Sequence, residues 1–461
     1  MSTDLSPCVS GPEKRLNPTM LTTRSSAEPE ESTTGRLAMR KSLANFARPR
    51  GADLLKRAAP FSQWRSARLE HRAWPYSRTL CSAPKETSVS LDENGEATEG
   101  YNFASQDYLS LSSHPDVLAA AERSIYSHGI HSAGSPVLLG NSQPSNLLEV
   151  ELGDFLQMSH TLLFPTGWAA GFGTITGLMR PKDHIVMDEL SHACLQQGAA
   201  ASGARIHRHL HLCLDSVRAK LAEIRRGDSR GAILVVTEGL FSMDSDVPQI
   251  EGLQAACHEF GATLLVDVAH DLGAMGPGGT GSLGNQGMLG KVDLVMGSFS
   301  KTFASNGGFL ACNSPEAHQF VKYMAGPHMF SNALSPLQAE VVRHCLKIIQ
   351  SSEGHHLRKK LMDAIHALRE AFGQAGVACL GSPSPIVPVP IGTEREARML
   401  SAKLGNHGVN ANLVEFPAVP RGAARFRMQV MANHTIADAK HAAARFMNAW
   451  EQVKSDSRVT S

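Results

Sequence analysis

The sequence predicts an α/β fold in which a mainly parallel sheet carries helices on both faces, followed by a smaller α+β domain. Short apolar, β-prone runs from about residue 100 end in turns or polar clusters, as in "GAILVVTEGLFSMD" and "ATLLVDVAHDLGAMG". Helix-like segments such as "SVRAKLAEIRR" and "EGLQAACHEFG" lie between them. This alternation is typical of βαβ units. After about residue 340 the alternation ends, which indicates a second domain.

Residues 1–99 are interpreted as an N-terminal extension. Its first part, to about residue 35, is rich in Ser, Thr, Pro and Glu, a composition typical of disorder. Residues 36–72 carry ten Lys or Arg against Asp53 and Glu70. This basic segment is an organellar address, a docking segment for an acidic partner, or a solvated extension packed on the catalytic body. The acidic "EPEE" upstream favours the packed extension.

Residues 100–340 are predicted to form the large domain and residues 341–461 the small one. One long helix is expected at about 335–375, before the extended "SPSPIVPVPIG", because proline is excluded from helix interiors. A helix in "EREARMLSAKLGNHG" and a strand in "ARFRMQVMANH" follow. In the closing helix, Thr435 can act as the N-cap.

Composition excludes several classes of function. The net charge is +1, so the chain as a whole has no electrostatic preference for nucleic acid or anionic membranes. No apolar run approaches the ~20 residues needed to span a bilayer, and the N-terminus lacks a secretory signal. The eight cysteines form no C-x-x-C pair, which indicates reduced thiols and a cytoplasmic setting. No metal site is expected: "RIHRHLHL" is interpreted as a strand with one solvated face.

Ionisable residues follow three successive predicted strands. Glu238 ends the first, in "TEGLFSMD". Asp267 ends the second, in "TLLVD", with His270 three residues later, and Lys301 follows the third, in "GSFSKTFASNGG". Ligands gather at the carboxyl ends of parallel strands. A buried carboxylate could pair with a protonated pyridine nitrogen, and a crowded lysine with a lowered pKa could form a Schiff base. These are the requirements of pyridoxal phosphate (PLP). Taken alone, Asp267 could equally be a helix cap or one half of a buried ion pair.

Ordered motifs from about 100 to 450 extend this interpretation. They are "NFASQDYLSL", "GNSQPSNLLEVELGDF", "FPTGWAAG", "DELSHACLQQGA", "VVTEGLFSMDSDVPQI", "LLVDVAHDLGAMG", "GSFSKTFASNGG", "SPIVPVPIG" and "RFRMQVMANHT". Because these motifs occur in this order, the chain resembles the α-oxoamine synthases, a branch of the PLP-dependent transferases of fold type I. The resemblance implies a large PLP-binding domain and a smaller C-terminal domain.

The resemblance also implies a role for each residue around the cofactor ring. Lys301 would bind PLP covalently and move the Cα proton of the substrate. Asp267 would pair with the pyridinium, and His270 and Ser242 would contact the ring oxygen. His192, in "SHA", would stack on the ring; its alternative is a packed core histidine.

A second set of residues would hold the cofactor phosphate. The resemblance assigns the N–H groups of Gly167 and Trp168, at the start of a predicted helix, to this role. Ser298 would add a hydroxyl group. Ser331 and Asn332, in "FSNALSP", would reach the phosphate of a neighbouring subunit, so a homodimer with shared sites is expected.

The substrate residues are the third set. Arg427 would bind the amino-acid carboxylate, and Arg425 could share that role; for either, the alternative is a surface charge. Glu238 and Gln106 are further candidates. Two positions depart from the family: Gln106 stands where many members have Asn, and Ser145 where many have His. The amino acid and the acyl chain therefore stay open.

The expected reaction is a decarboxylative condensation of an amino acid with an acyl thioester, on CoA or a carrier protein, giving an α-amino ketone. An aminotransferase or aldolase on the same scaffold is the nearest alternative. A non-catalytic partner subunit is another, and the presence of Lys301 argues against it. A pyridoxal-binding regulator is disfavoured, because the sequence shows no helix-turn-helix module. A nicotinamide dehydrogenase is also disfavoured, because no G-x-G-x-x-G follows the first strand.

Overall fold

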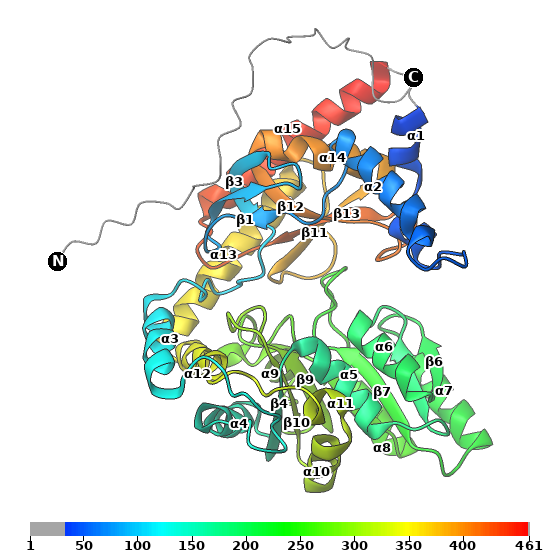
Figure 1. Ribbon diagram of the computed structural model, residues 1–461, viewed down its shortest axis with the longest axis vertical. Helices are drawn as coiled ribbons and strands as arrows, with labels where there is room; N and C mark the ends of the chain where they lie inside the picture. The colour runs from blue at the N-terminus through cyan, green and yellow to red at the C-terminus, as the bar shows by residue number, and fades with distance from the viewer. Residues whose placement is uncertain (1–32, 460–461) are drawn as a thin grey trace, which may run out of the picture.

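The computed structural model describes residues 33–459, which form two sheets with their helices (Figure 1). The seven-stranded sheet, in the lower part of the view, has the order β4-β10-β9-β8-β7-β5-β6. The strands β9, β8, β7, β5 and β6, adjacent in this order, are parallel to one another. In this sheet only β10 runs antiparallel to its two neighbours, β4 and β9. The predicted mainly parallel sheet is therefore confirmed. Its strands are β4 (His160–Phe164), β5 (His184–Asp188), β6 (Arg205–His209), β7 (Ile233–Glu238), β8 (Thr263–Asp267), β9 (Leu294–Ser298) and β10 (Gly308–Cys312).

The central strands are buried on both faces, which explains their continuous apolar runs. Along β7, Ile233 and Val235 join one core cluster, whereas Leu234 and Val236 join the other. One face packs against α5 (Gly167–Leu178), α6 (Ala193–Ser202), α10 (Pro315–Met324) and α11 (Gly326–Met329). The other face packs against α4 (Gln143–Leu156), α7 (Leu214–Gly227), α8 (Ile250–Phe260) and the short α9 (Gly281–Asn285).

The six-stranded sheet has the order β1-β2-β3-β12-β13-β11. It joins β1 (Thr79–Leu80), β2 (Thr87–Leu91) and β3 (Ala97–Phe103) to β11 (Ile386–Gly392), β12 (Val409–Val414) and β13 (Ala424–Gln429). The parallel β3–β12 pair unites the two ends of the chain. The expected domain boundary at residue 100 thus falls inside β3, because local sequence patterns do not reveal which distant strand a strand pairs with.

Helices α3 (Pro115–His128), α12 (Pro336–Gln350) and α13 (Ser352–Gln374) lie beside and between the two sheets (Figure 1). The single helix expected at 335–375 is wrong, because it breaks at Ser351. Ser351 caps α13 by accepting a hydrogen bond from the Gly354 N–H at 3.3 Å. A Cβ at Gly354 would lie 2.3 Å from the Ile348 carbonyl oxygen, so the tight junction requires glycine.

The second sheet is covered by α14 (Glu394–Leu404) and α15 (Ile436–Val459). Thr435 caps α15 as predicted, accepting from the Asp438 N–H at 3.1 Å. Short 3-10 turns complete the described chain: η1 (Leu43–Phe46), η2 (Lys56–Ala58), η3 (Pro277–Gly279) and η4 (Gly405–His407). No helix between residues 33 and 459 is long and apolar enough to cross a membrane. Within the same range, no cluster of His, Cys, Asp or Glu could hold a metal ion.

The basic N-terminal segment forms α1 (Thr33–Arg40) and α2 (Ala59–Glu70), which pack beside the second sheet (Figure 1). Arg68 is fully buried, and its Nη1 lies 3.0 Å from a carboxylate oxygen of Glu415. Arg398 donates to the other oxygen at 2.6 Å. Part of the positive charge of this segment is therefore structural. The disorder expected to about residue 35 falls mostly on residues 1–32, which lie outside the described residues, and α1 already begins at Thr33.

Candidate active site

A cavity of about 290 Å³ opens at the carboxyl ends of β7, β8 and β9. Eight residues predicted from the sequence line it together: Gly167, Trp168, His192, Glu238, Asp267, His270, Ser298 and Lys301. Parallel β-strands bring them together, because Glu238, Asp267 and Ser298 are the last residues of adjacent strands. The site therefore lies where an open α/β sheet binds its ligands.

The amine of Lys301 is held in a partly buried position three residues beyond β9. Burial lowers the pKa of Lys301, Asp267 opposes this shift, and Arg427 adds to it. A lysine with a lowered pKa is unprotonated more often, which suits it to attack a carbonyl carbon. Ser300 and Gly307 line the cavity together with Lys301.

Asp267 is 6% exposed, and burial raises its pKa, whereas His192 and a hydrogen bond from the Ala269 N–H at 2.9 Å lower it. No Lys or Arg in the described chain forms an ion pair with it. A buried carboxylate without a counter-ion is costly. A cationic group in the cavity, such as a pyridinium, would remove that cost.

His270 is fixed by Tyr108, whose hydroxyl lies 3.0 Å from its Nδ1 and 3.4 Å from Gln429 Oε1. Burial lowers the pKa of His270 well below its usual range, and Lys301 and Arg427 add to this. Burial also raises the pKa of Tyr108, so the phenol keeps its proton. Sequence reasoning missed Tyr108. Its only signal is its place inside the motif "NFASQDYLSL".

Glu238 accepts a hydrogen bond from the backbone N–H of His192 at 2.6 Å. Burial and nearby Asp267 raise the pKa of Glu238 well above its usual range. The indole of Trp168 meets the His192 ring edge-on, with centroids 6.2 Å apart. The structure thus gives Glu238 a direct role in holding the loop that carries His192, in addition to the substrate contact expected from the sequence.

The N-terminus of α5 forms one end of the cavity. Thr166 caps the helix by accepting from the Ala169 N–H at 3.0 Å, and the first two helical residues have no intrahelical acceptor. Gly167 is required here, since a Cβ would lie 2.4 Å from the Ser298 side chain. The helix N-terminus and the Ser298 hydroxyl together suit an anion such as phosphate.

Arg427 reaches the site from β13 in the other sheet. Burial lowers its pKa, and its buried Nε has no hydrogen-bond partner. It is close enough to lower the pKa of both Lys301 and His192. Arg425, two residues earlier, is instead bound to Asp244 and to the Met243 carbonyl at 3.2 Å. The structure therefore separates the two arginines: Arg427 is available to a carboxylate, and Arg425 is occupied.

Comparison with known proteins agrees with this geometry. The family model for aminotransferase class I and II matches residues 98–446. The 8-amino-7-oxononanoate synthase of Klebsiella pneumoniae (strain 342) is 35% identical over 348 residues, 76% of this chain and 88% of the relative. The same enzyme of Stutzerimonas stutzeri (strain A1501) is 32% identical over 374 residues, 81% and 92% of the two chains.

The chain belongs to the aminotransferase class I and II family. Solved structures narrow the branch. SPT with a PLP internal aldimine superposes with a TM-score of 0.81 at 27% identity, covering 87% of this chain and 99% of the other. A Sphingomonas wittichii serine palmitoyltransferase gives 0.81 at 26% identity, over the same shares. With the synthase relatives, these structures confirm a PLP-dependent α-oxoamine synthase.

The residues present fit PLP. The synthase offers an unpaired buried carboxylate at Asp267, an amine of lowered pKa at Lys301 and an anion site at Gly167. Not every predicted cofactor residue joins them: Ser242, Ser331 and Asn332 are absent from the cavity lining. Ser242 is buried nearby, and the Asn332 amide lies 3.1 Å from His131 Nε2 on an exposed segment.

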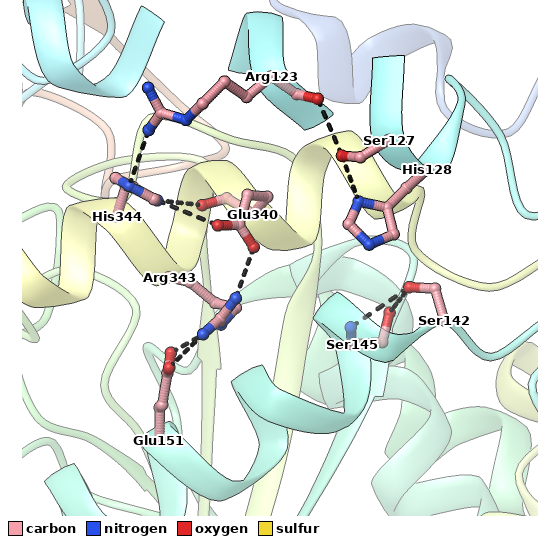
Figure 2. Close-up of polar contacts among 9 residues, drawn as sticks. All are labelled: Arg123, Ser127, His128, Ser142, Ser145, Glu151, Glu340, Arg343 and His344. Carbon is pink, nitrogen blue, oxygen red and sulfur yellow. Dashed lines mark hydrogen bonds and ion pairs between the residues drawn. The ribbon is translucent and has the colours of Figure 1, made fainter. Parts of the chain in front are cut away.

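The two positions that depart from the family also differ in placement. Gln106 lines a second cavity of about 480 Å³ together with Lys301. Ser145 is buried at the start of α4, with its hydroxyl 2.9 Å from that of Ser142, the helix cap (Figure 2). Arg343 of α12 holds the same helix through Glu151 at 2.6 and 3.0 Å (Figure 2). Only Gln106 therefore borders a space that contains Lys301.

Proposed function

We propose that this synthase condenses an amino acid with an acyl thioester. The Cα of the amino acid bonds to the thioester carbonyl carbon, the thiol and CO₂ leave, and a proton returns to give an α-amino ketone. The observation that carries the proposal is that Lys301 and Asp267 line one cavity, while Arg427, whose Nε has no hydrogen-bond partner, lies close enough to lower the pKa of Lys301. PLP, when bound, supplies an electron sink for the negative charge at Cα.

The residues divide this work by position. Lys301 would hold the cofactor covalently, and its Nζ would accept and return the Cα proton of the amino acid. Asp267 would hold the cofactor by its pyridine nitrogen, where a negative charge favours the protonated form. Arg427 binds the amino-acid carboxylate through its planar fork, and the buried site excludes water from it. The second cavity, which shares Lys301 with the first, supplies room for the acyl donor.

The donor is proposed to carry a negative charge at the far end of its acyl group. A third cavity of about 350 Å³ shares Ser105 with the second and contains Arg78. Arg78 is bound only by neutral oxygens, those of Asn410, Ala411 and Asn412 at 2.8–3.3 Å. No carboxylate in the described chain pairs with it, so an acidic donor would complete the site. The compound that the relatives are named for making, 8-amino-7-oxononanoate, carries a carboxylate.

A homodimer with shared sites is part of the proposal. Large apolar side chains are exposed in two segments: Tyr126, Ile130, Leu138, Leu139 and Phe330 are 68–93% exposed. Hydrogen bonds from Ser135 to Met329 and between Asn332 and His131 bring these segments together. Patches of this kind mark association surfaces. Ser331 and Asn332 follow Phe330 directly, so a partner on this face would receive them. We also place the reaction in the cytoplasm, which agrees with the seven free cysteines among residues 33–459.

A thiol-release screen tests the function. The enzyme with PLP is mixed with single amino acids and acyl-CoAs of varied length, and free thiol and CO₂ are measured. The wild type should release both in equal amounts with at least one pair, and Lys301→Ala should release neither. Lys291→Ala, the same change at an exposed lysine, is the control. Conversion of the amino acid to its oxo acid without thiol release would establish an aminotransferase instead.

A further inference from the structure

Two donors from one residue converge on the ring of His192. The backbone N–H of Cys194 lies 3.3 Å from His192 Nδ1, where the histidine caps helix α6. The Sγ of the same cysteine lies 3.0 Å from the same ring nitrogen. Both contacts leave Nε2, on the opposite side of the ring, as the free nitrogen of a side chain that lines the cavity.

The direction of these hydrogen bonds follows from chemistry. A backbone N–H can only donate, so Nδ1 must offer its lone pair. The thiol is a second donor to Nδ1, because burial raises the pKa of Cys194 and keeps its side chain as S–H rather than thiolate. A protonated Nδ1 would point its hydrogen at two donors. The ring is therefore neutral, with its proton on Nε2.

Burial and the charges around the ring together lower the pKa of His192, which favours the neutral ring. His192 is exposed where it borders the cavity, yet the protein around it still excludes much water, which lowers its pKa. Asp267 of β8 raises that pKa, whereas Lys301 and Arg427 lower it further. Glu238 of β7 takes the backbone N–H of His192 and makes no hydrogen bond to the ring.

The thiol is held in place from the neighbouring helix. Cys194 is 2% exposed, between α5 and α6. A Cβ at Gly171 of α5 would lie 2.8 Å from its Sγ and 3.2 Å from Leu195. Only glycine leaves this space, so the sulfur fills it and remains directed at the ring. The cysteine is thus rigid without being reactive.

We propose that Cys194 is a positioning residue that fixes His192 as its Nε2–H tautomer. His192 then presents a hydrogen-bond donor to the oxygens of the bound substrates and does not act as a base toward them. This inference deepens the proposed function and rests on it for the identity of those oxygens. The tautomer itself is a property of the folded holoenzyme, whatever reaction it catalyses.

Kinetics give the first test. The acid limb of the kcat/KM profile is measured for the PLP-loaded wild type, Cys194→Ala, Cys194→Ser and Cys257→Ala, a change at a buried cysteine on α8. Protonation of Nδ1 breaks both contacts to Cys194 and releases the ring, so activity should fall as His192 takes up this proton. Loss of one weak donor should raise the pKa of that limb by about half to one unit in Cys194→Ala. The serine variant, which keeps a donor, and Cys257→Ala should retain the wild-type limb. An unshifted limb in Cys194→Ala would overturn the proposal.

A readout independent of turnover separates this inference from the proposed function. Nitrogen NMR of ¹⁵N-histidine-labelled holoenzyme, with the His192 signals assigned by their absence in His192→Gln, reports which ring nitrogen is protonated. The proton should be on Nε2 in the wild type, and Cys194→Ala should protonate the ring at higher pH. A proton on Nδ1 in the wild type would refute the proposal even if thiol release were observed.

Discussion

Arg78 shows how one residue can select a substrate. Its guanidinium has three neutral acceptors and no acid, and two buried groups in the same cavity, Ser88 Oγ and Asn410 Nδ2, have no partner. Arg78→Gln should raise KM for a dicarboxylic acyl-CoA roughly ten- to hundred-fold, the loss of one charged hydrogen bond. For the monocarboxylic acyl-CoA of equal length, KM should hardly change.

The measured quantity is the ratio of the KM values for the dicarboxylic and the monocarboxylic acyl-CoA. A general loss of stability in Arg78→Gln would affect the activity with both donors equally and leave this ratio unchanged. Arg72→Gln is the control, since Arg72 is exposed and pairs with Glu96 at 2.9 Å. An equal rise in KM for both donors would show that Arg78 holds β12 in place and recognises no acyl charge.

Single residues of the site were predictable where the evidence is local. Asp267 and Lys301 each follow an apolar strand that places them at the sheet edge, so their neighbours in sequence are enough. Tyr108 and Arg78 were missed, because their partners lie 162 and more than 300 positions away. Cys194 was visible only as an ordinary member of "SHAC", since its role depends on a hydrogen-bond direction.

At the scale of elements, His211 joins the ends of two strands. Its Nδ1 lies 2.9 Å from Asp188 at the end of β5, and its Nε2 lies 3.1 Å from Asp246 in the loop after β7. Burial lowers the pKa of His211, but hydrogen bonds to the two aspartates outweigh this and raise it to about 10. Because the unfolded value is 6.5, its stabilisation is complete below about pH 6.5 and is lost as the pH rises through about 10.

His211→Gln should therefore lower the free energy of unfolding by about 1–3 kcal/mol at pH 6.5, the range for hydrogen bonds to charged groups. The difference from wild type should disappear above about pH 10. Urea unfolding across this pH range measures it, with the exposed His355→Gln as control. A difference that stays constant with pH would mean that packing against Phe241, and not charge, stabilises the junction.

At the scale of the whole molecule, the sequence predicted one of the two sheets better than the other. Period and composition predicted the parallel sheet, because each βαβ unit is local. Only part of the second sheet was predicted, because its β3 pairs with β12, a strand about 300 residues later in the chain. The position of this sheet matters for the site, because it brings the charge of Arg427 on β13 close enough to lower the pKa of Lys301, which follows β9 of the first sheet.

The proposed dimer would build each active site from residues of two chains, and complementation between inactive variants tests this. Lys301→Ala and the double variant Ser331→Ala, Asn332→Ala should each be inactive as homodimers. Refolded together at equal amounts, half of the dimers should be mixed, each with one intact site of two, so about a quarter of wild-type thiol release should return. Leu139→Glu, which places a charge on the exposed apolar face, should prevent both dimerisation and this rescue. If every site were built from one chain, mixed dimers would hold two damaged sites and no activity would return.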